Sequence, residues 1–206
     1  MGRAPYTLPS VETKPEAVAE AGQATRRETV GESAIIVPVN VPVGVNRLRD
    51  RMDPSAADGV PAHITLIYPF MPPSELKDDV RRRIEQIIAE EPSFPFVLTA
   101  VRRWPAVVYL EPQPDEPFRR LTSALAAAFP DYPPYEGVHD EIVPHLTVAA
   151  DAPEDYYEAA EHALPGFLPI RDVCREAWLI GHTPEQSWHT LWRLPFGRSS
   201  GAYPGR

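Results

Sequence analysis

The sequence carries one four-residue pattern twice, as His63-Ile64-Thr65-Leu66 and, further along, as His145-Leu146-Thr147-Val148. In each copy a histidine and a threonine are two positions apart, with apolar residues between and after them. Successive side chains of a β-strand point to opposite faces, so the histidine and threonine share one face and the apolar pair shares the other. Two such strands facing each other would bring two imidazoles and two hydroxyls together. That arrangement suits acid–base chemistry on a phosphate ester.

The repeat is more specific than either copy alone. In a chain with six histidines and 43% apolar residues, two matched copies are expected in roughly one chain in a thousand. Both copies begin a predicted strand, at Ala62-His63 and at Pro144-His145, and both follow a turn-rich, acidic loop. A single copy would be better explained as a structural histidine in a half-buried strand. The pair indicates a duplicated functional site.

The composition bounds the class of protein. A chain of 206 residues is long enough for one sizeable domain with a buried core. It has no apolar run near the roughly 18 residues of a membrane span, and residues 1–31 lack the apolar region of a signal peptide. We therefore expect a cytoplasmic monomer without a membrane partner. The net charge of −9 argues against an extended nucleic-acid-binding surface, but not against a small nucleotide or an RNA end in a local pocket.

The other chemically active side chains are expected to be structural. Cys174 is the single cysteine, so it can form neither an internal disulfide nor a zinc cluster, and we expect it to be a small buried hydrophobe. His162, His182 and His189 fall on a predicted helix or beside a hairpin turn, where structural roles are the better interpretation. Neither motif has a carboxylate cluster or a second histidine at ligand spacing, so we expect no metal and no other cofactor.

Hydrophobic periodicity and turn residues divide the chain into elements. Residues 1–31 and 198–206 are expected to be tails, and residues 32–197 one domain. Strands are predicted at 33–41, 62–68, 94–103, 107–111, 145–150, 170–182 and 188–194, and helices at 45–52, 74–90 with Ser74 as N-cap, 117–129 and 154–164. The mixed order and the frequent hairpins predict an α+β fold with antiparallel sheets. The similar positions of the two motif strands suggest two pseudo-symmetric lobes with flanking helices around a central cleft.

The motifs resemble the 2H phosphoesterase superfamily and, within it, the 2′-5′ RNA ligase (LigT-like) proteins of bacteria. The resemblance covers residues 33–197 and is carried by the segments 63–70, 132–135 and 144–149, together with the closing strand that contains Trp188 and Trp192. It implies a bilobal fold in which the two His-x-Thr strands face each other across a cleft. It also implies metal-independent hydrolysis of cyclic phosphodiesters, and hence a role in RNA processing.

The proposed chemistry assigns a role to each motif residue. Opening a 2′,3′-cyclic phosphate requires a base for the attacking water and an acid for the departing ribose oxygen, and imidazole performs either role near neutral pH. We expect His63 and His145 to be catalytic, with a weak preference for His145 as the base. The Thr65 and Thr147 hydroxyls are expected to bind the phosphoryl oxygens, whose charge grows in the transition state.

Several further residues are candidates for substrate contacts. Tyr135 and His139 lie in the long loop before the second motif, although a surface position is the simpler expectation for His139. Phe70 follows the first motif and could stack on a base. Arg102 and Arg103 follow a core strand, and of the two Arg103 is the candidate phosphate contact. Alternation along the strand places Tyr68 on the face away from His63.

Two other functions fit the same residues. The reverse reaction would make the protein a 2′-5′ RNA ligase, or an enzyme that cleaves such linkages. A catalytically idle nucleotide- or phosphate-binding module is the third possibility, but such a module would have no chemical need for both histidines and both threonines. We therefore expect a cyclic phosphodiesterase whose partner is a small nucleotide or an RNA end.

Overall fold

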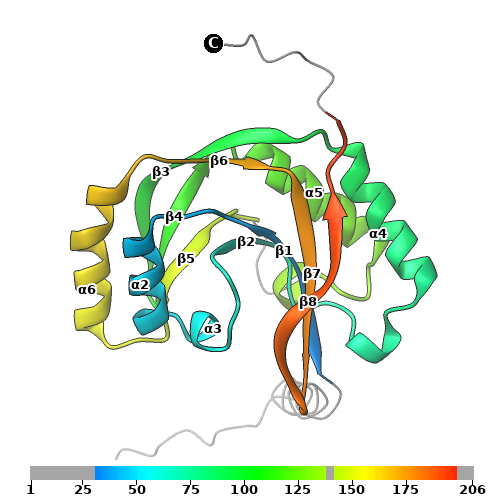
Figure 1. The fold of residues 1–206 in the computed structure, drawn as a ribbon, viewed down its shortest axis with the longest axis horizontal. Helices are drawn as coiled ribbons and strands as arrows, with labels where there is room; N and C mark the ends of the chain where they lie inside the picture. Colours follow the sequence, from blue (N-terminus) through cyan, green and yellow to red (C-terminus); the bar gives the residue numbers. More distant parts are fainter. Residues whose placement is uncertain (1–30, 138–141, 199–206) are drawn as a thin grey trace, which may run out of the picture.

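The computed structural model of the chain describes residues 31–137 and 142–198. In these residues the strands form two antiparallel sheets of four strands each, flanked by helices (Figure 1). The predicted α+β class with two antiparallel sheets is confirmed. Among the helices of the described residues, none is long and apolar enough to cross a membrane.

The first sheet has the strand order β2-β1-β7-β8. Its strands are β1 (Glu32–Pro38), β2 (His63–Ile67), β7 (Glu176–Thr183) and β8 (Gln186–Pro195). The first His-x-Thr motif therefore lies on an edge strand that pairs with β1. Strand β1 is central, and its run from Ala34 to Val37 is buried on both faces, as expected for a continuous apolar strand.

The second sheet has the strand order β5-β4-β3-β6. Its strands are β3 (Phe94–Trp104), β4 (Val107–Gln113), β5 (Leu146–Ala150) and β6 (Ile170–Cys174). Strands β3 and β4 form the predicted hairpin. The second motif again occupies the edge strand: His145 directly precedes β5, and Thr147 lies within it.

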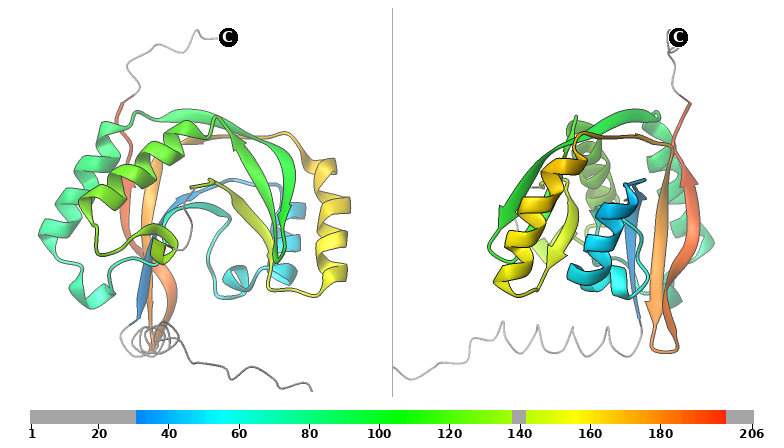
Figure 2. Two further views of the ribbon diagram at one scale, coloured as in Figure 1. Left: turned by 180° about the vertical axis from the view of Figure 1, so that it is seen from behind. Right: turned by 60° about the vertical axis from the view of Figure 1, so that its left-hand side comes forward.

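The two halves of the chain repeat one arrangement of elements. A strand, a helix, the motif strand and a further helix follow one another as β1-α2-β2-α4 and as β4-α5-β5-α6. The helices are α2 (Val43–Met52), α4 (Asp78–Glu90), α5 (Glu116–Ala128) and α6 (Glu154–Ala163), with the short α3 (Pro54–Ala57) between α2 and β2. Helix α2 packs against β5 of the other sheet and α5 against β2, and β2 also contacts β5 (Figure 2). This exchange brings the two motifs, far apart in sequence, side by side.

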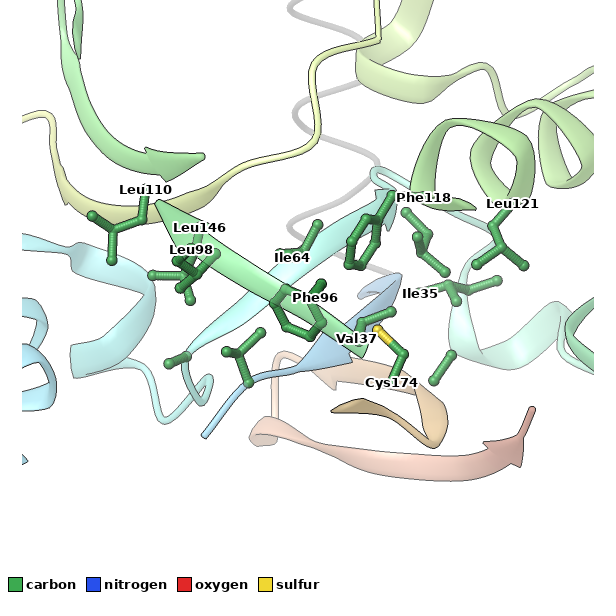
Figure 3. Close-up of a cluster of buried hydrophobic side chains, with 14 of the residues drawn as sticks. Ile35, Val37, Ile64, Phe96, Leu98, Leu110, Phe118, Leu121, Leu146 and Cys174 are labelled. Carbon is green, nitrogen blue, oxygen red and sulfur yellow. The ribbon is translucent and has the colours of Figure 1, made fainter. Parts of the chain in front are cut away.

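One hydrophobic core connects the two sheets. Ile64 and Leu146, the residues between the histidine and the threonine of each motif, are fully buried in it beside Phe96 and Leu98 (Figure 3). Burial of one such side chain contributes about 1.5–3 kcal/mol. A slip of one residue in either strand would lose this energy and turn the histidine into the core. The core therefore determines the face on which the polar motif residues lie.

The predicted strand 170–182 is wrong as a single element. Strand β6 ends at Cys174, which pairs with Phe94 of the second sheet, and β7 begins at Glu176, which pairs with Pro195 of the first. Arg175 lies between them, and its carbonyl accepts the backbone N–H of Phe196 at 3.0 Å. No glycine or proline marks this crossing in the sequence, so the sequence did not indicate a change of sheet. Cys174 is buried as expected, and burial raises the pKa of its thiol.

The start of the helix predicted from Ser74 is also wrong. Residues Pro73–Glu75 form a separate 3₁₀ turn, and Leu76 then adopts an extended conformation. Helix α4 begins at Asp78, with Lys77 in the N-cap position. The Tyr132 hydroxyl donates to the Glu75 carboxylate at 3.1 Å, a contact from a distant segment that the local capping signal could not show.

Candidate active site

The polar residues of both motifs lie on the face of each edge strand that is turned away from the core. In the first sheet Thr65 pairs with Ile36, whereas the core residue Ile64 pairs with Val37. In the second sheet Thr147 pairs with Tyr109 of β4. The four motif side chains are half-buried: His63, Thr65, His145 and Thr147. Because β2 and β5 contact each other, the structure brings these four predicted residues into one region.

Both histidines are held in the same way. The Nδ1 atom of His63 is 2.7 Å from the Pro61 carbonyl oxygen, and Nδ1 of His145 is 2.7 Å from the Val143 carbonyl oxygen. A carbonyl oxygen can only accept a hydrogen bond, so Nδ1 carries the proton in each ring. In the neutral imidazole, Nε2 then keeps its lone pair. Each motif thus presents one basic nitrogen, oriented by the carbonyl two residues before its histidine.

The surroundings of the histidines favour their neutral forms. Burial lowers the pKa of His63 from 6.5 to about 4, against the opposing effect of its bond to Pro61. A charge on Arg49 or on His145 lowers this pKa further, while Asp53 raises it. Burial also lowers the pKa of His145. The effect of His145 on His63 shows that the two imidazoles lie within electrostatic reach of each other, and burial favours the neutral form of both rings in the free protein.

Aromatic rings surround His145. The ring centroids of Trp104 and Tyr109 lie 4.8 and 5.4 Å from the imidazole centroid, both edge to face, and Tyr135 stacks at 6.5 Å. Trp104 also covers Tyr109 at 4.3 Å. Trp104 was not among the predicted contacts, although its place at the end of β3, next to a hairpin turn, was visible in the sequence.

Tyr135 connects the two halves at this site. Its backbone N–H donates to the carbonyl of Tyr68, at the end of β2 in the first half, at 2.7 Å. Its ring lies over His145, which belongs to the second half, as Tyr135 itself does. Tyr135 and Glu136 have φ values of 50° and 57°, a left-handed conformation that costs non-glycine residues about 1–3 kcal/mol each. Burial raises the pKa of Tyr135 to about 12, so its hydroxyl remains a hydrogen-bond donor at physiological pH.

Other candidate contacts lie elsewhere. Phe70 is buried in the core, with its ring 5.2 Å from that of Phe129. Arg103 lies on the α6 side of β3, where its ion-pair partners are two glutamates of α6. Its guanidinium bonds Glu154 at 2.6 Å and Glu161 at 3.1 Å. The structure brings neither Phe70 nor Arg103 to the motifs, and His139 lies outside the described residues.

The expected orientation of Tyr68 is wrong. A β-bulge interrupts the pairing of β1 with β2 between Ile35 and Ile36, and both Leu66 and Ile67 are buried in the core. The extra residue inverts the alternation, so Tyr68 lies on the same side as Thr65. There it packs with Ile36 and other residues of a second, smaller apolar cluster.

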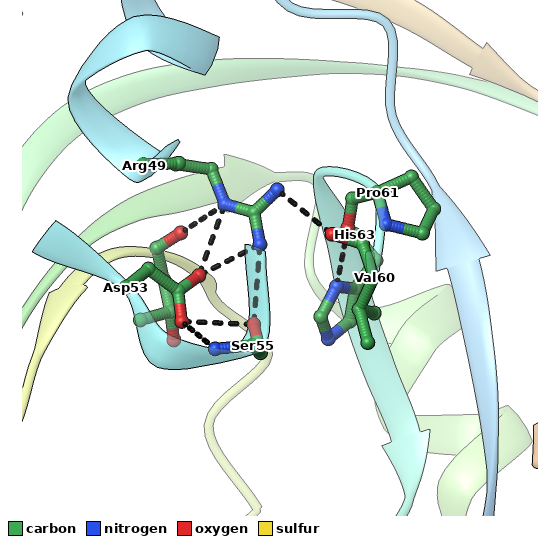
Figure 4. Close-up of polar contacts among 7 residues, drawn as sticks. Arg49, Asp53, Ser55, Val60, Pro61 and His63 are labelled. Carbon is green, nitrogen blue, oxygen red and sulfur yellow. Dashed lines mark hydrogen bonds and ion pairs between the residues drawn. The ribbon is translucent and has the colours of Figure 1, made fainter. Parts of the chain in front are cut away.

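A buried ion pair lies behind the motifs, and sequence reasoning missed it. Arg49 of α2 bonds Asp53 with Nη2 at 2.7 Å and Nε at 3.1 Å (Figure 4). The Arg49 residue is only 2% exposed. Its Nε also donates to the Thr147 carbonyl at 3.1 Å, and its Nη1 lies 3.5 Å from the Val60 carbonyl. Arg49 therefore links the segment before the first motif with the strand of the second.

The described residues contain no group of three or more histidine, cysteine, aspartate or glutamate side chains that could hold a metal ion. What the site does contain is two oriented imidazoles, two hydroxyls and a set of aromatic rings. These groups can transfer protons, donate hydrogen bonds to anionic oxygens and stack on planar ligands.

Two pseudo-symmetric lobes with a His-x-Thr motif on the edge strand of each sheet define a LigT-like fold. Solved structures with this fold include Escherichia coli LigT complexed with NADP+ (TM-score 0.50, 17% identity, covering 82% of this chain and 99% of that one). TT0787 of Thermus thermophilus is similar (TM-score 0.51, 18% identity, 80% and 97% covered).

Sequence comparison assigns the family. The family described as the 2'-5' RNA ligase superfamily matches residues 37–184. A curated protein of Geobacillus kaustophilus, "Putative phosphoesterase GK0864", is 30% identical over 79% of this chain and 87% of its own length. The chain belongs to the 2'-5' RNA ligase superfamily, as the motifs predicted.

Proposed function

We propose that this protein is a phosphodiesterase that opens 2′,3′-cyclic phosphodiesters of nucleotides or RNA ends, with His63 and His145 as the two residues that transfer protons. The observation that carries the proposal is the matched pair of imidazoles, each with Nδ1 held by a carbonyl and Nε2 available for proton transfer. Membership in a superfamily with a phosphoesterase relative supports the reaction class.

The proposed reaction is an in-line displacement at phosphorus. One Nε2 accepts a proton from water as its oxygen bonds to phosphorus, and the other Nε2–H gives a proton to the ribose oxygen as its bond to phosphorus breaks. The product is a phosphomonoester with a free neighbouring hydroxyl. Thr65 and Thr147 donate hydrogen bonds to the non-bridging oxygens, where negative charge grows.

Substrate binding favours uptake of the missing proton from solvent. Burial favours the neutral form of both histidines in the free protein, whereas the mechanism needs one neutral and one protonated ring. The negative charge of a bound phosphodiester raises the pKa of a neighbouring imidazole, so the anion promotes formation of the acid. His63 has the more strongly lowered pKa and remains neutral more readily. This favours His63 as the base, opposite to the weak preference from sequence.

The aromatic rings around His145 support a nucleotide as the ligand. Stacking of a base on an aromatic ring is worth about 1–3 kcal/mol for any base, and Trp104 and Tyr135 are half-buried beside the imidazole. Escherichia coli LigT, with the same fold, has been crystallised with NADP+. Ligation or cleavage of 2′-5′ linkages would use the same residues.

The test is an assay of the purified protein on the four 2′,3′-cyclic nucleotides, a cyclic-phosphate RNA oligonucleotide and linear 2′-5′ dinucleotides, with EDTA present. We expect turnover of the cyclic substrates in EDTA, because the two histidines supply both proton transfers. Loss of activity in EDTA with recovery on adding Zn²⁺ or Mn²⁺ would contradict the two-histidine mechanism. Turnover of the linear dinucleotides alone would favour an enzyme that acts on 2′-5′ linkages. Binding of the substrates without turnover would favour a catalytically idle binding module.

A further inference from the structure

The two halves share a second, less obvious repeat: an arginine held at the carbonyl three residues before each motif histidine. Arg49 of α2 lies with Nη1 3.5 Å from the Val60 carbonyl, and Val60 precedes His63 by three residues. Arg119 of α5 donates from Nη1 to the Ile142 carbonyl, three residues before His145. Both arginines come from the helix that precedes the motif strand in their own half.

Each arginine is fixed by an aspartate one helical turn away. Arg49 bonds Asp53, and Arg119 bonds Asp115, each at 2.7 Å. Asp53 in turn accepts hydrogen bonds from the Ser55 backbone N–H at 3.0 Å and from its hydroxyl at 2.8 Å, which caps α3. A guanidinium held by a carboxylate has one preferred orientation, because its donors form a planar fork.

The arginine and the histidine of each half act on adjacent carbonyls. In the first half Arg49 faces the Val60 carbonyl and His63 bonds that of Pro61 (Figure 4). In the second half Arg119 bonds the Ile142 carbonyl and His145 bonds that of Val143. A rotation of the peptide at one carbonyl moves the next, so each arginine restrains the group that orients its histidine.

Arg49 makes one contact that Arg119 is not seen to repeat in the described residues. Its Nε donates to the Thr147 carbonyl at 3.1 Å, so the buried pair in the first half also restrains the motif strand of the second. Arg49 and Asp53 are nearly inaccessible, with side chains 2% and 3% exposed, whereas those of Arg119 and Asp115 are 34% and 25% exposed.

We propose that Arg49 and Arg119 are positioning residues that set the ring orientation and tautomer of His63 and His145. Each does so by holding the peptide segment whose next carbonyl receives the Nδ1 proton. Groups that orient a functional imidazole through its second nitrogen determine which nitrogen meets the substrate. The expected effect of these arginines on the reaction rate rests on the proposed function. Their expected effect on the histidine tautomers does not depend on it.

The test replaces each ion pair with neutral residues of similar size. Removing the arginine alone would leave a buried carboxylate unpaired, whereas replacing both partners is often tolerated. Arg49→Met/Asp53→Asn keeps an oxygen that caps α3, and Arg119→Met/Asp115→Asn is its counterpart. The control is Arg81→Met/Glu85→Gln, which removes an exposed pair one turn apart on α4, 2.8 Å long.

We expect kcat on a cyclic nucleotide to fall about 10- to 100-fold in both double variants, with KM changed less than about 3-fold. A misplaced catalytic group loses rate by this order while ground-state binding changes little. The control should retain the wild-type kcat. Arg49→Lys and Arg119→Lys keep the charge but lose the fork, so they test the same point if a double variant fails to fold, and we expect them to lose kcat as well. A wild-type kcat in folded Arg49 and Arg119 variants would overturn the proposal.

Imidazole ¹H–¹⁵N NMR supplies a readout that needs no activity. In the wild type both motif histidines should be in the Nδ1–H tautomer. Arg119→Met/Asp115→Asn should mix the tautomers of His145 alone, whereas Arg49→Met/Asp53→Asn should disturb His63 and, through Thr147, also His145. Unchanged tautomers in both variants would overturn the positioning role. A wild type that is inactive on every cyclic substrate would instead contradict the proposed function and leave the NMR test intact.

Discussion

At the scale of single residues, the two His-x-Thr motifs are held in the same way. Each histidine uses the carbonyl two residues before it, and each apolar middle residue is buried in the core. This part of the site could be predicted from sequence, because strand alternation alone separates the polar face from the apolar one. Arg49 could not be predicted, because its role depends on carbonyls of segments 11 and 98 residues away.

The first prediction concerns the motif residues. His63→Ala and His145→Ala should each lower kcat by about 10²–10⁴-fold, the usual contribution of a general acid or base. The double variant should be little worse than either single one, because groups that act as a unit are not additive. Thr65→Ala and Thr147→Ala should lose less, since each removes a hydrogen bond rather than a proton transfer. Steady-state kinetics with circular dichroism as a folding check measures this, and a folded, active His145→Ala protein would refute it.

The second prediction follows from the lowered pKa of His63. The unfolded chain binds a proton at this residue below pH 6.5, whereas the folded protein binds it only near pH 4. The unfolded state is therefore favoured as the pH falls through this window, and the free energy of unfolding should drop by up to about 3 kcal/mol. His63→Gln cannot titrate and lacks this contribution.

Urea unfolding of both proteins between pH 4.5 and 7 measures the effect as a difference. Subtracting the variant removes the contribution of all other titrating groups. We expect the stability advantage of the wild type over His63→Gln to shrink as the pH falls. A difference that stays constant across this range would show that the folded protein does not hold His63 neutral.

At the scale of elements, the type of each helix or strand could be predicted more readily than its boundaries or its pairing with other strands. The apolar stripe of α4 and the hairpin β3–β4 were evident from periodicity. The bulge in β2 and the crossing at Arg175 were not, because the bulge preserves a plausible apolar pattern while it changes a face, and no glycine or proline marks the crossing. Arg103 shows the same limit. Arg102 and Arg103 are adjacent in β3, so their side chains point to opposite faces, and the sequence does not show which of the two faces α6. The structure shows that Arg103 does, through its ion pair with Glu154.

The third prediction concerns the segment after β8, which closes the first sheet onto α4. Gly197 donates its N–H to the Glu91 carbonyl at 2.9 Å and accepts from the Ser93 N–H at 3.0 Å. A Cβ at Gly197 would lie 2.4 Å from the Ala89 carbonyl oxygen. Gly197→Ala should therefore destabilise the protein by about 1–3 kcal/mol, measured by urea unfolding. Gly166→Ala is the control, with nothing within 4 Å of its added Cβ. Equal stability of the two variants would contradict this.

At the scale of the whole molecule, the two halves exchange helices rather than lying side by side as separate units. Each contributes a helix that packs on the motif strand of the other, and one core runs through both sheets. The class and the pseudo-symmetry could be predicted from sequence, but not this exchange. Repeated motifs reveal two similar units, whereas only tertiary contacts show which helix covers which strand.

The fourth prediction tests the proposed boundary of the domain. Residues 1–31 lack apolar periodicity, so a variant that lacks them should melt within a few degrees of the full chain and keep its activity. Differential scanning calorimetry measures the comparison. Insolubility of the shortened protein, or a much lower melting temperature, would show that this segment contributes to the folded domain.

The strand order β2-β1-β7-β8 has a consequence for synthesis of the chain on the ribosome. The second sheet uses one continuous stretch, residues 94–174, and can assemble as it emerges. Strand β1 instead cannot pair with β7 until about 140 further residues have been synthesised. At about 5–20 residues per second, their synthesis takes roughly 7–28 seconds. During this interval the apolar edge of β1 is an open template for other nascent chains. Premature termination before residue 176 would make that exposure permanent, so such truncated products should aggregate.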